Sequence, residues 1–249
     1  MKIEILGCSG SVAIGFNTTS ILINGDTLID AGSAASVLPD AVILGIRHIL
    51  LTHSHIDHIK ELPFILDVMY SNHTQGVTIW GSKQTMDVLK AHVFNGLIWP
   101  EMEELKVDES VFRFACVPAD EFEIGRLNVK AVEVKHIPGS VAYVVSEGDR
   151  SVIFSGDTGY TQALFDLAVS FGDKLRFFFI EASFPNRMHD IATLTHHLTP
   201  AMIDGGIQDF LKHSPQVIAY HIKPKYLQEV LSELPERVDA IKGGEVFNL

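Results

Sequence analysis

Apolar positions along this 249-residue chain form short runs bounded by turn residues, or recur at every third or fourth position. The short runs are typical of β-strands and the longer period is typical of helices. In the first half, the predicted strands are Ile3–Leu6, Ser20–Ile23, Thr27–Asp30 and Ile49–Thr52. The predicted helices are Ile59–Tyr70 and a second helix that Ser82 caps and that runs to about His92.

The second half repeats this order of strands and helices. Its predicted strands are Asn128–Lys135, Val141–Val145, Ser151–Phe154, Arg176–Ile180, Gln216–Tyr220 and Glu245–Asn248. Its predicted helices are Thr161–Phe171, a helix that begins at Thr199 and Pro200 and runs to about Lys212, and Tyr226–Leu234. The last four residues of Arg176–Ile180, Phe177–Ile180, are continuously apolar, which predicts a strand buried on both faces. The pattern predicts an α/β fold with two mixed sheets face to face and helices outside, in one domain, 1–249, with halves of about 1–125 and 126–249.

Four of the predicted strands are followed directly by a histidine or an acidic residue, and a fifth is followed by an acidic residue three positions later. The strand Ile49–Thr52 runs into six residues that include His53, His55, Asp57 and His58, and the other four strands are followed by His136, Asp157, Glu181 and His221. Neutral imidazole and carboxylate are ligands that zinc and similar divalent metals prefer. Ligands of α/β proteins gather beyond the carboxyl ends of strands. The sequence therefore predicts a metal site at these ends.

The spacing of these donors predicts two metal ions. His53 and His55 are two residues apart, so in an extended segment they point to the same side and can hold one ion together. Asp57 and His58 are displaced enough to serve a second ion. His136 would complete the first site, His221 the second, and Asp157 would bridge both through its two oxygens. Zinc is the first expectation, and manganese or iron would also be accepted. The alternative interpretation is that these residues are solvated loop histidines. That interpretation would suit a single histidine better than it suits this run of donors.

Composition narrows the class of ligand. The chain is 47% hydrophobic and 20% charged, as in an ordinary globular protein. Its net charge of −12 has the wrong sign for gripping a long nucleic acid. A small anion remains possible, because bound metals supply positive charge locally. Two cysteines exclude a disulfide framework, and no signal peptide or long apolar span is evident, so we expect a cytoplasmic protein outside the membrane.

The motifs THSHIDH, VKH, FSGDTG and AYH resemble those of the metallo-β-lactamase superfamily over essentially the whole chain. This resemblance implies an αββα four-layer sandwich with a one- or two-metal site at its rim. GCSGS and DAGS are similar to the nucleotide-processing branch, and HVFNGLIWP, IEASFPN and HHLTP to class II 3′,5′-cyclic nucleotide phosphodiesterases. The usual first motif is closer to HxHLDHxxGL. Here Ile56 and Glu61 replace its Leu and Gly, and Glu61 is expected to put a carboxylate near the site entrance.

The resemblance implies hydrolysis of cAMP or cGMP to the nucleoside 5′-monophosphate by a hydroxide that bridges the two metals. It puts His197 at a functional position, and we expect His197 to protonate the departing 3′-oxygen. Because His197 precedes a helix N-cap, we also expect it to face a phosphate and the helix amides. From residue type alone, a surface histidine is as good an interpretation.

We also expect catalytic, supporting or substrate-binding roles for several further residues. Asp57 is predicted to be catalytic as well as a metal ligand. Glu181 ends a buried strand and needs a partner; it would orient a ligand imidazole or His197, or form a structural salt bridge. Possible contacts to the substrate are Asn95, Trp99, Phe184 and Thr199. Trp99 can also be read as a core residue at the end of an amphipathic helix.

Three other functions are compatible with parts of the pattern. A tRNA 3′-processing endonuclease shares the superfamily motif, but the negative charge and the lack of a basic arm argue against it. A generic esterase or thioesterase of the same fold is a second alternative. A non-catalytic metal-binding or nucleotide-sensing domain is a third. The resemblance also implies a possible homodimer.

Overall fold

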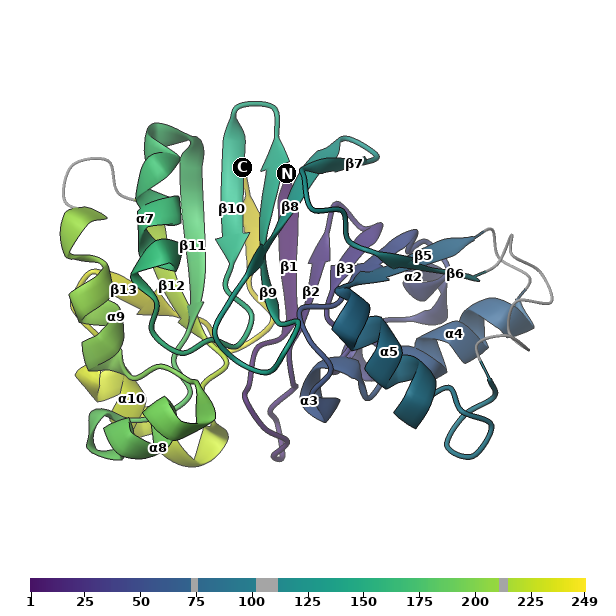
Figure 1. The fold of residues 1–249 in the computed structure, drawn as a ribbon, viewed down its shortest axis with the longest axis horizontal. Coiled ribbons are helices and arrows are strands. Elements are labelled where there is room, and N and C mark those ends of the chain that lie inside the picture. Colours follow the sequence, from purple (N-terminus) through teal and green to yellow (C-terminus); the bar gives the residue numbers. More distant parts are fainter. Residues whose placement is uncertain (73–75, 102–111, 211–214) are drawn as a thin grey trace. The chain divides into compact units, whose positions relative to one another are not determined.

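The computed structural model describes residues 1–72, 76–101, 112–210 and 215–249. The chain divides into two compact units. Unit 1 consists of Met1–Gly7, Asn17–Val117 and Gly243–Asn248, and unit 2 consists of Cys8–Phe16, Pro118–Lys242 and Leu249. Each unit contains one seven-stranded sheet (Figure 1). Among the described residues, no helix has the length and apolar character needed to cross a membrane.

The sheet of unit 1 has the order β14-β1-β2-β3-β4-β5-β6. Its strands are β1 Lys2–Gly7, β2 Ser20–Ile23, β3 Thr27–Ile29, β4 His48–Leu50, β5 Val77–Gly81, β6 Phe112–Cys116 and β14 Val246–Asn248. Pairing is antiparallel from β14 to β3 and parallel from β3 to β6. The helices are α1 Ala34–Val37, α2 Asp40–Ile43, α3 Ile56–Ile59, α4 Leu62–Ser71 and α5 Lys83–His92. Ile49 and Ile79 of the sheet pack with Ile65 and Leu66 of α4 and Leu89 of α5 in one buried cluster.

The sheet of unit 2 has the order β13-β12-β11-β10-β9-β8-β7. Its strands are β7 Phe122–Ile124, β8 Leu127–Glu133, β9 Val141–Glu147, β10 Arg150–Phe154, β11 Leu175–Glu181, β12 Gln216–Tyr220 and β13 Val238–Ala240. Pairing is antiparallel from β7 to β10 and parallel from β10 to β13. The α-helices are α7 Gln162–Ser170, α8 His189–Thr195, α9 Pro200–Gly206 and α10 Leu227–Glu233.

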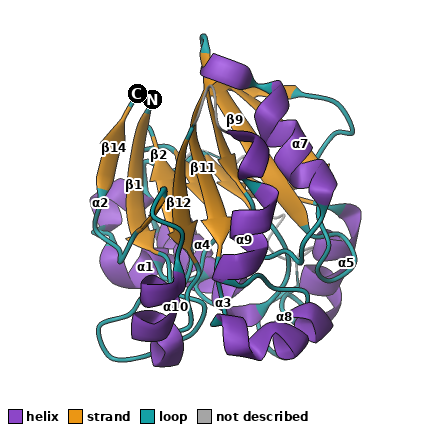
Figure 2. Cartoon of the chain, turned by 90° about the vertical axis from the view of Figure 1, so that its left-hand side faces the viewer, coloured by secondary structure: helices purple, strands orange, loops and turns teal. Residues whose placement is uncertain are grey.

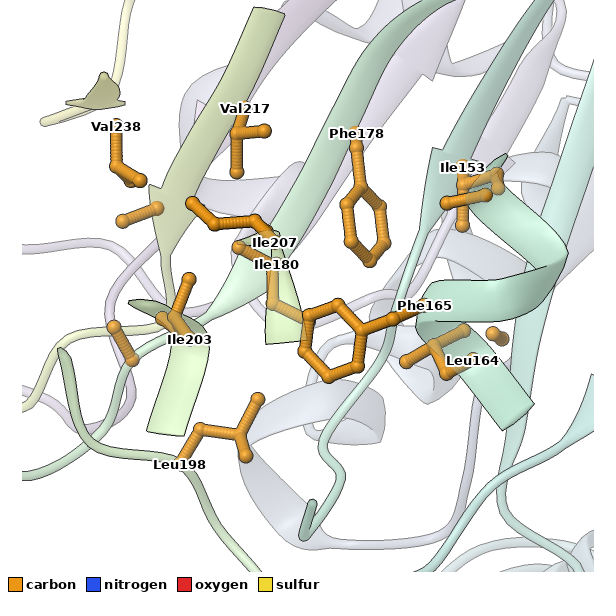
Figure 3. Packing of buried hydrophobic residues seen from close by; sticks show 14 of the residues in the cluster. Ile153, Leu164, Phe165, Phe178, Ile180, Leu198, Ile203, Ile207, Val217 and Val238 are labelled. Atoms are coloured by element: carbon orange, nitrogen blue, oxygen red, sulfur yellow. The ribbon is translucent and has the colours of Figure 1, made fainter. Parts of the chain in front are cut away.

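Helices α7, α9 and α10 lie on the same side of β11 and β12 (Figure 2). Figure 3 shows Phe165 of α7 converging with Phe178 and Ile180 of β11 in the middle of this cluster. Phe178 and Phe179, neighbours on opposite faces of β11, are both 0% exposed. The prediction of a strand buried on both faces is therefore confirmed.

Several predicted boundaries are wrong for identifiable reasons. The helix predicted at Ile59–Tyr70 starts later, as α4 at Leu62, because Glu61 takes the N-cap position and Pro63, which has no N–H to donate, lies in the first turn. Ile59 is instead the last residue of the separate helix α3. The strand predicted to reach Lys135 ends at Glu133. Strands β5, β6, β7 and β13 and helices α1, α2 and α8 were not predicted.

The helix predicted from Thr199 to Lys212 begins as expected, with Thr199 at the N-cap and Pro200 in the first turn. It ends early, at Gly206, where two consecutive glycines lower the helix propensity. A short 3₁₀ helix, Gln208–Phe210, follows, and the rest of the predicted helix lies outside the described residues.

Gly206 also allows α9 to approach α7. A Cβ atom at Gly206 would overlap the ring of Phe165, whereas a Cβ at Gly205 would have no atom within 4 Å. We therefore expect Gly206→Ala to destabilise the protein by about 1–3 kcal/mol through overpacking, despite the better helix propensity of alanine. Gly205→Ala is the matched control and should be neutral or stabilising by up to about 1 kcal/mol. Urea denaturation of both variants measures the difference; equal stabilities would refute the packing argument.

Candidate metal centre

Of the donors of unit 1, His53 and His55 lie between β4 and α3, and Asp57 and His58 lie in α3. His53 follows the end of β4 by three residues, and His55 is the N-cap of α3. The ring centroid of His53 lies 4.7 Å from that of His55 and 4.2 Å from that of His58. Nε2 of His58 lies 3.9 Å from a carboxylate oxygen of Asp57. The predicted run of donors therefore gathers within one short segment.

A buried carboxylate, Asp30, supports this segment. Its two oxygens accept hydrogen bonds from the backbone N and the hydroxyl of Thr52, each at 2.8 Å. One oxygen also lies 2.7 Å from Nδ1 of His58. Because a carboxylate only accepts, Nδ1 carries the proton and Nε2 keeps its lone pair. A carboxylate behind the imidazole is the usual support of a histidine that binds a metal. Asp30 was not predicted as a functional residue, although it opens the DAGS motif.

Gly32 of the DAGS motif lets two segments of unit 1 approach each other. A Cβ atom at this position would overlap the carbonyl oxygen of Asp57 and would lie 2.6 Å from the hydroxyl of Thr18. Glycine is therefore required by space here. The loop that starts at Asp30 is held directly against the donor segment.

The donors of unit 2 gather around Asp157, which is 2% exposed. One oxygen of Asp157 lies 3.8 Å from Nε2 of His136, and the other lies 3.2 Å from Nδ1 of His221. Asp157, His197 and His221 each offer a ligand atom, and these atoms lie within 4.8 Å of one another. The carboxylate thus faces two imidazoles through different oxygens.

Glu181, the last residue of β11, is 0% exposed, and both of its carboxylate oxygens make hydrogen bonds. One oxygen lies 2.7 Å from Nδ1 of His197 and accepts from the backbone N of Thr158 at 3.2 Å. The other accepts from the backbone N of Ser183 at 2.9 Å. Of the interpretations that the sequence left open, contact with His197 is the one that the structure contains.

The surroundings of His197 favour its charged form. Burial lowers the pKa of His197, but the charge of Glu181, their hydrogen bond and the charge of Asp157 together outweigh it, so that the pKa is raised. Lys223 opposes this rise. A histidine with a raised pKa is suited to donate a proton near neutral pH.

Two neighbours of His197 and His221 were not predicted. The hydroxyl of Ser183 lies 3.2 Å from Nδ1 of His197 and 3.1 Å from Nδ1 of His221. The ammonium of Lys223 donates to the carbonyl of Gly10 at 3.1 Å and lies 5.2 Å from the ring centre of Phe184. Their proximity in sequence to Glu181 and His221 was the available signal.

The predicted substrate contacts have different environments. The ring of Phe184 lies 5.7 Å from that of His197, in unit 2. Asn95 accepts hydrogen bonds from Leu97 N at 3.0 Å and Ile98 N at 2.9 Å, which stabilises the turn after α5. The ring centroid of Trp99 lies 5.5 Å from that of Phe64. Trp99 is partly buried and packs against the unit 1 core, as its alternative interpretation proposed. Binding roles for these residues and for the buried Thr199 stay predictions.

The carboxylate of Glu61 is engaged within unit 1, and its expected place near the site entrance stays a prediction. Glu61 is 9% exposed, and its carboxylate accepts from the backbone N and the hydroxyl of Ser36 at 2.9 and 2.8 Å. Lys60 donates to it at 3.3 Å. The carboxylate is thus used inside unit 1 to hold α1.

The amides at the start of α9 are also engaged within unit 2. Pro200 has no N–H. The N–H of Ala201 donates to Oδ1 of Asn186 at 2.8 Å, and the N–H of Met202 donates to the carbonyl of Thr199 at 3.1 Å. That His197 faces a phosphate stays a prediction.

Comparisons of the sequence agree with the resemblance. The family described as cAMP phosphodiesterases class-II matches residues 40–154. The 3′,5′-cyclic-nucleotide phosphodiesterase 1 of Saccharomyces cerevisiae is 44% identical over 62 residues, which are 24% of this chain and 17% of that protein. A probable 3′,5′-cyclic-nucleotide phosphodiesterase of Yersinia pestis is 26% identical over 96% of this chain and 84% of that protein. Proteins named ribonuclease Z also align with part of the chain.

Comparisons of the structure establish the fold. Unliganded yeast PDE1 has a TM-score of 0.84 at 19% identity, over 100% of this chain and 99% of that chain. The metallo-β-lactamase fold protein YhfI of Bacillus subtilis has a TM-score of 0.78 at 14% identity, over 99% of both chains. The predicted α/β fold of the metallo-β-lactamase type is confirmed. So is the resemblance to the class-II phosphodiesterases, and with it the prediction of an enzyme of phosphodiesterase type.

Proposed function

We propose that this chain, a metallo-β-lactamase-fold relative of the class-II 3′,5′-cyclic nucleotide phosphodiesterases, hydrolyses cAMP or cGMP to the nucleoside 5′-monophosphate. The observation that carries the proposal is the arrangement in unit 2. A buried carboxylate, Asp157, faces two imidazoles, and a third imidazole, His197, is held nearby by Glu181. This combination supplies both metal donors and a proton donor.

The donor chemistry fits divalent cations. Asp30 holds Nδ1 of His58, and Nδ1 of His136 donates to the carbonyl of His196 at 3.0 Å, so each of these two imidazoles keeps Nε2 as a ligand atom. We assign the ligands as the sequence predicts. His53, His55 and His136 would hold one ion, Asp57, His58 and His221 would hold the other, and Asp157 would serve both. Bound cations, zinc first and manganese or iron as alternatives, would neutralise the phosphate charge and lower the pKa of a water toward neutrality.

His197 would act on the leaving group. The ribose 3′-oxygen departs as an alkoxide, which is a poor leaving group unless it receives a proton. Glu181 holds the Nδ1 proton of His197, so the proton on Nε2 of the imidazolium is the one that can be given. The charge of Glu181 also raises the pKa of His197 against the effect of burial and keeps that proton available.

The alternatives are less consistent with this chain. A tRNA 3′-processing endonuclease has to grip a long polyanion, which a net charge of −12 opposes. A thioesterase releases a thiolate, which is a good leaving group and does not need the proton that His197 would give. A non-catalytic sensor would not need His197 beside Glu181.

A substrate panel tests the proposal. Protein loaded with zinc or manganese is assayed with cAMP, cGMP, bis-p-nitrophenyl phosphate, a thioester and precursor tRNA, and products are separated by chromatography. We expect 5′-AMP or 5′-GMP, loss of about 100-fold or more of this activity after chelation, and recovery when metal is restored. Circular dichroism of the chelated protein controls for unfolding. Turnover of the thioester or tRNA without turnover of either cyclic nucleotide would refute the proposal.

Two further properties belong to the proposal. They are a homodimeric assembly, which the resemblance alone implies, and a cytoplasmic location, which the composition favours. Sedimentation of the purified full chain measures the first property.

A further inference from the structure

Thr199 occupies the N-cap position of α9 but does not cap the helix. Its backbone is extended (φ −114°, ψ 161°), as this position requires, yet its side chain makes no capping hydrogen bond. A threonine there normally accepts from the N–H of the second or third helical residue. The N–H of Ala201, the second residue of α9, donates instead to Oδ1 of Asn186 at 2.8 Å. Asn186 thus caps α9 from a different segment.

Asn186 is itself held by α10. Its backbone N donates to Glu233, the last residue of α10, at 2.6 Å. The next residue, Arg187, makes two hydrogen bonds to Glu229 of the same helix, at 2.7 and 3.1 Å. Exposed ion pairs contribute little to stability individually, but a two-point contact fixes orientation. The cap of α9 is therefore tied to α10.

His197 lies in the segment that leads into α9, two residues before Thr199. The backbone N of His197 donates to the carbonyl of Ala192 at 2.8 Å, and the backbone N of Phe184 donates to the carbonyl of Leu198 at 3.3 Å. Leu198 is 0% exposed. The other end of the segment is the first turn of α9, which Asn186 fixes. A shift of that turn would carry the His197 imidazole away from Glu181.

We propose that Asn186 is a positioning residue for His197. By capping α9 in place of Thr199, it sets how close α9 lies to the 183–186 loop, and so where the imidazole stands against Glu181. A displacement of about 1 Å in a group that transfers a proton costs up to about 100-fold in rate. This inference rests on the proposed function, in which His197 protonates the leaving oxygen.

Variants that keep the shape of Asn186 test the proposal. Asparagine, aspartate and leucine branch alike, but leucine cannot accept the Ala201 N–H. Asn186 lines a cavity of about 660 Å³, so either replacement fits without overpacking. In Asn186→Leu, the hydroxyl of Thr199 can turn to the Ala201 N–H, so we expect the Tm to fall by no more than about 4 °C.

Catalysis should respond differently from stability. In Asn186→Leu, we expect kcat for the cyclic nucleotide to fall about 10- to 100-fold, with KM changed less than about 3-fold. Turnover of bis-p-nitrophenyl phosphate, whose leaving group needs no proton, should fall less than about 3-fold. Asn186→Asp should recover kcat to within about 3-fold of the native enzyme. Equal losses on both substrates, or no loss, would overturn the proposal.

A double-mutant cycle with His197→Ala sharpens the test. If Asn186 acts through His197, adding Asn186→Leu to His197→Ala should change kcat less than about 2-fold. A further loss as large as in the native background would show that Asn186 acts elsewhere.

A measurement without catalysis separates this inference from the proposed function. The proton that Nδ1 of His197 shares with Glu181 should give a downfield NMR signal in the native protein. We expect this signal to shift or broaden in Asn186→Leu and to return in Asn186→Asp. An unchanged signal in Asn186→Leu overturns the positioning role whether or not the protein hydrolyses cyclic nucleotides. A shifted signal in a protein without such activity supports the role and refutes only the proposed function.

Discussion

Asp157→Ala is expected to reduce kcat for a cyclic nucleotide by about 1,000-fold or more. The carboxylate of Asp157 lies between His136 and His221, at 3.8 and 3.2 Å, and is nearly completely buried. Alanine would remove the ligand that we assign to both cations and leave two imidazoles without the charge that they face. Steady-state kinetics with cAMP and cGMP and the metal content by elemental analysis measure the effect together.

Two comparisons make the Asp157 result interpretable. Asp157→Asn keeps the shape and removes the charge, so we expect a loss nearly as large as in Asp157→Ala. Asp166→Ala, which removes an exposed carboxylate that accepts from Gln162 on α7, should leave kcat within about 2-fold. An Asp157→Ala enzyme with normal turnover and normal metal content would refute the assigned role.

His197→Ala is expected to show the second largest effect, and one that depends on the leaving group. Loss of a general acid costs about 100- to 10,000-fold when the leaving oxygen needs a proton. The cyclic nucleotide should therefore suffer this loss. Bis-p-nitrophenyl phosphate, which releases a stable phenolate, should lose less than about 10-fold. The ratio of the two kcat values, native against variant, is the measurement.

The pH dependence provides the control for His197. The acid must be protonated, and the pKa of His197 is raised by Glu181 and Asp157 against the effect of burial. Activity on the cyclic nucleotide should thus be present below this raised pKa and decline as the pH rises through it. His197→Ala should lack that decline. Equal losses on both substrates, with the alkaline decline unchanged, would exclude His197 as the acid.

Local pattern was enough to predict several strands with their bounds. Ser20–Ile23 and Gln216–Tyr220 have their predicted bounds, because each is an apolar, partly β-branched run between turn residues. Short strands such as Val238–Ala240 and the early end of α9 were missed, since three residues carry little periodic signal and glycine propensity competes with helical period.

The residues behind the donors could not be predicted in the same way. Asp30 meets His58 across 28 positions, and Asn186 meets Ala201 across 15. Such contacts depend on how loops close in space, and no local period of the sequence encodes them. The donor residues were found because each follows an apolar run in the sequence. The residues that support them can be identified only from contacts in the folded protein.

The tight fit at Gly32 has a practical consequence for mutagenesis of the donor segment. Even a methyl group there would collide with the Asp57 carbonyl and push the donor segment outward. Mutant libraries should therefore keep codon 32 fixed, whereas surface positions such as Leu97 and Ile98, which are 90% and 68% exposed, can be varied without such a collision.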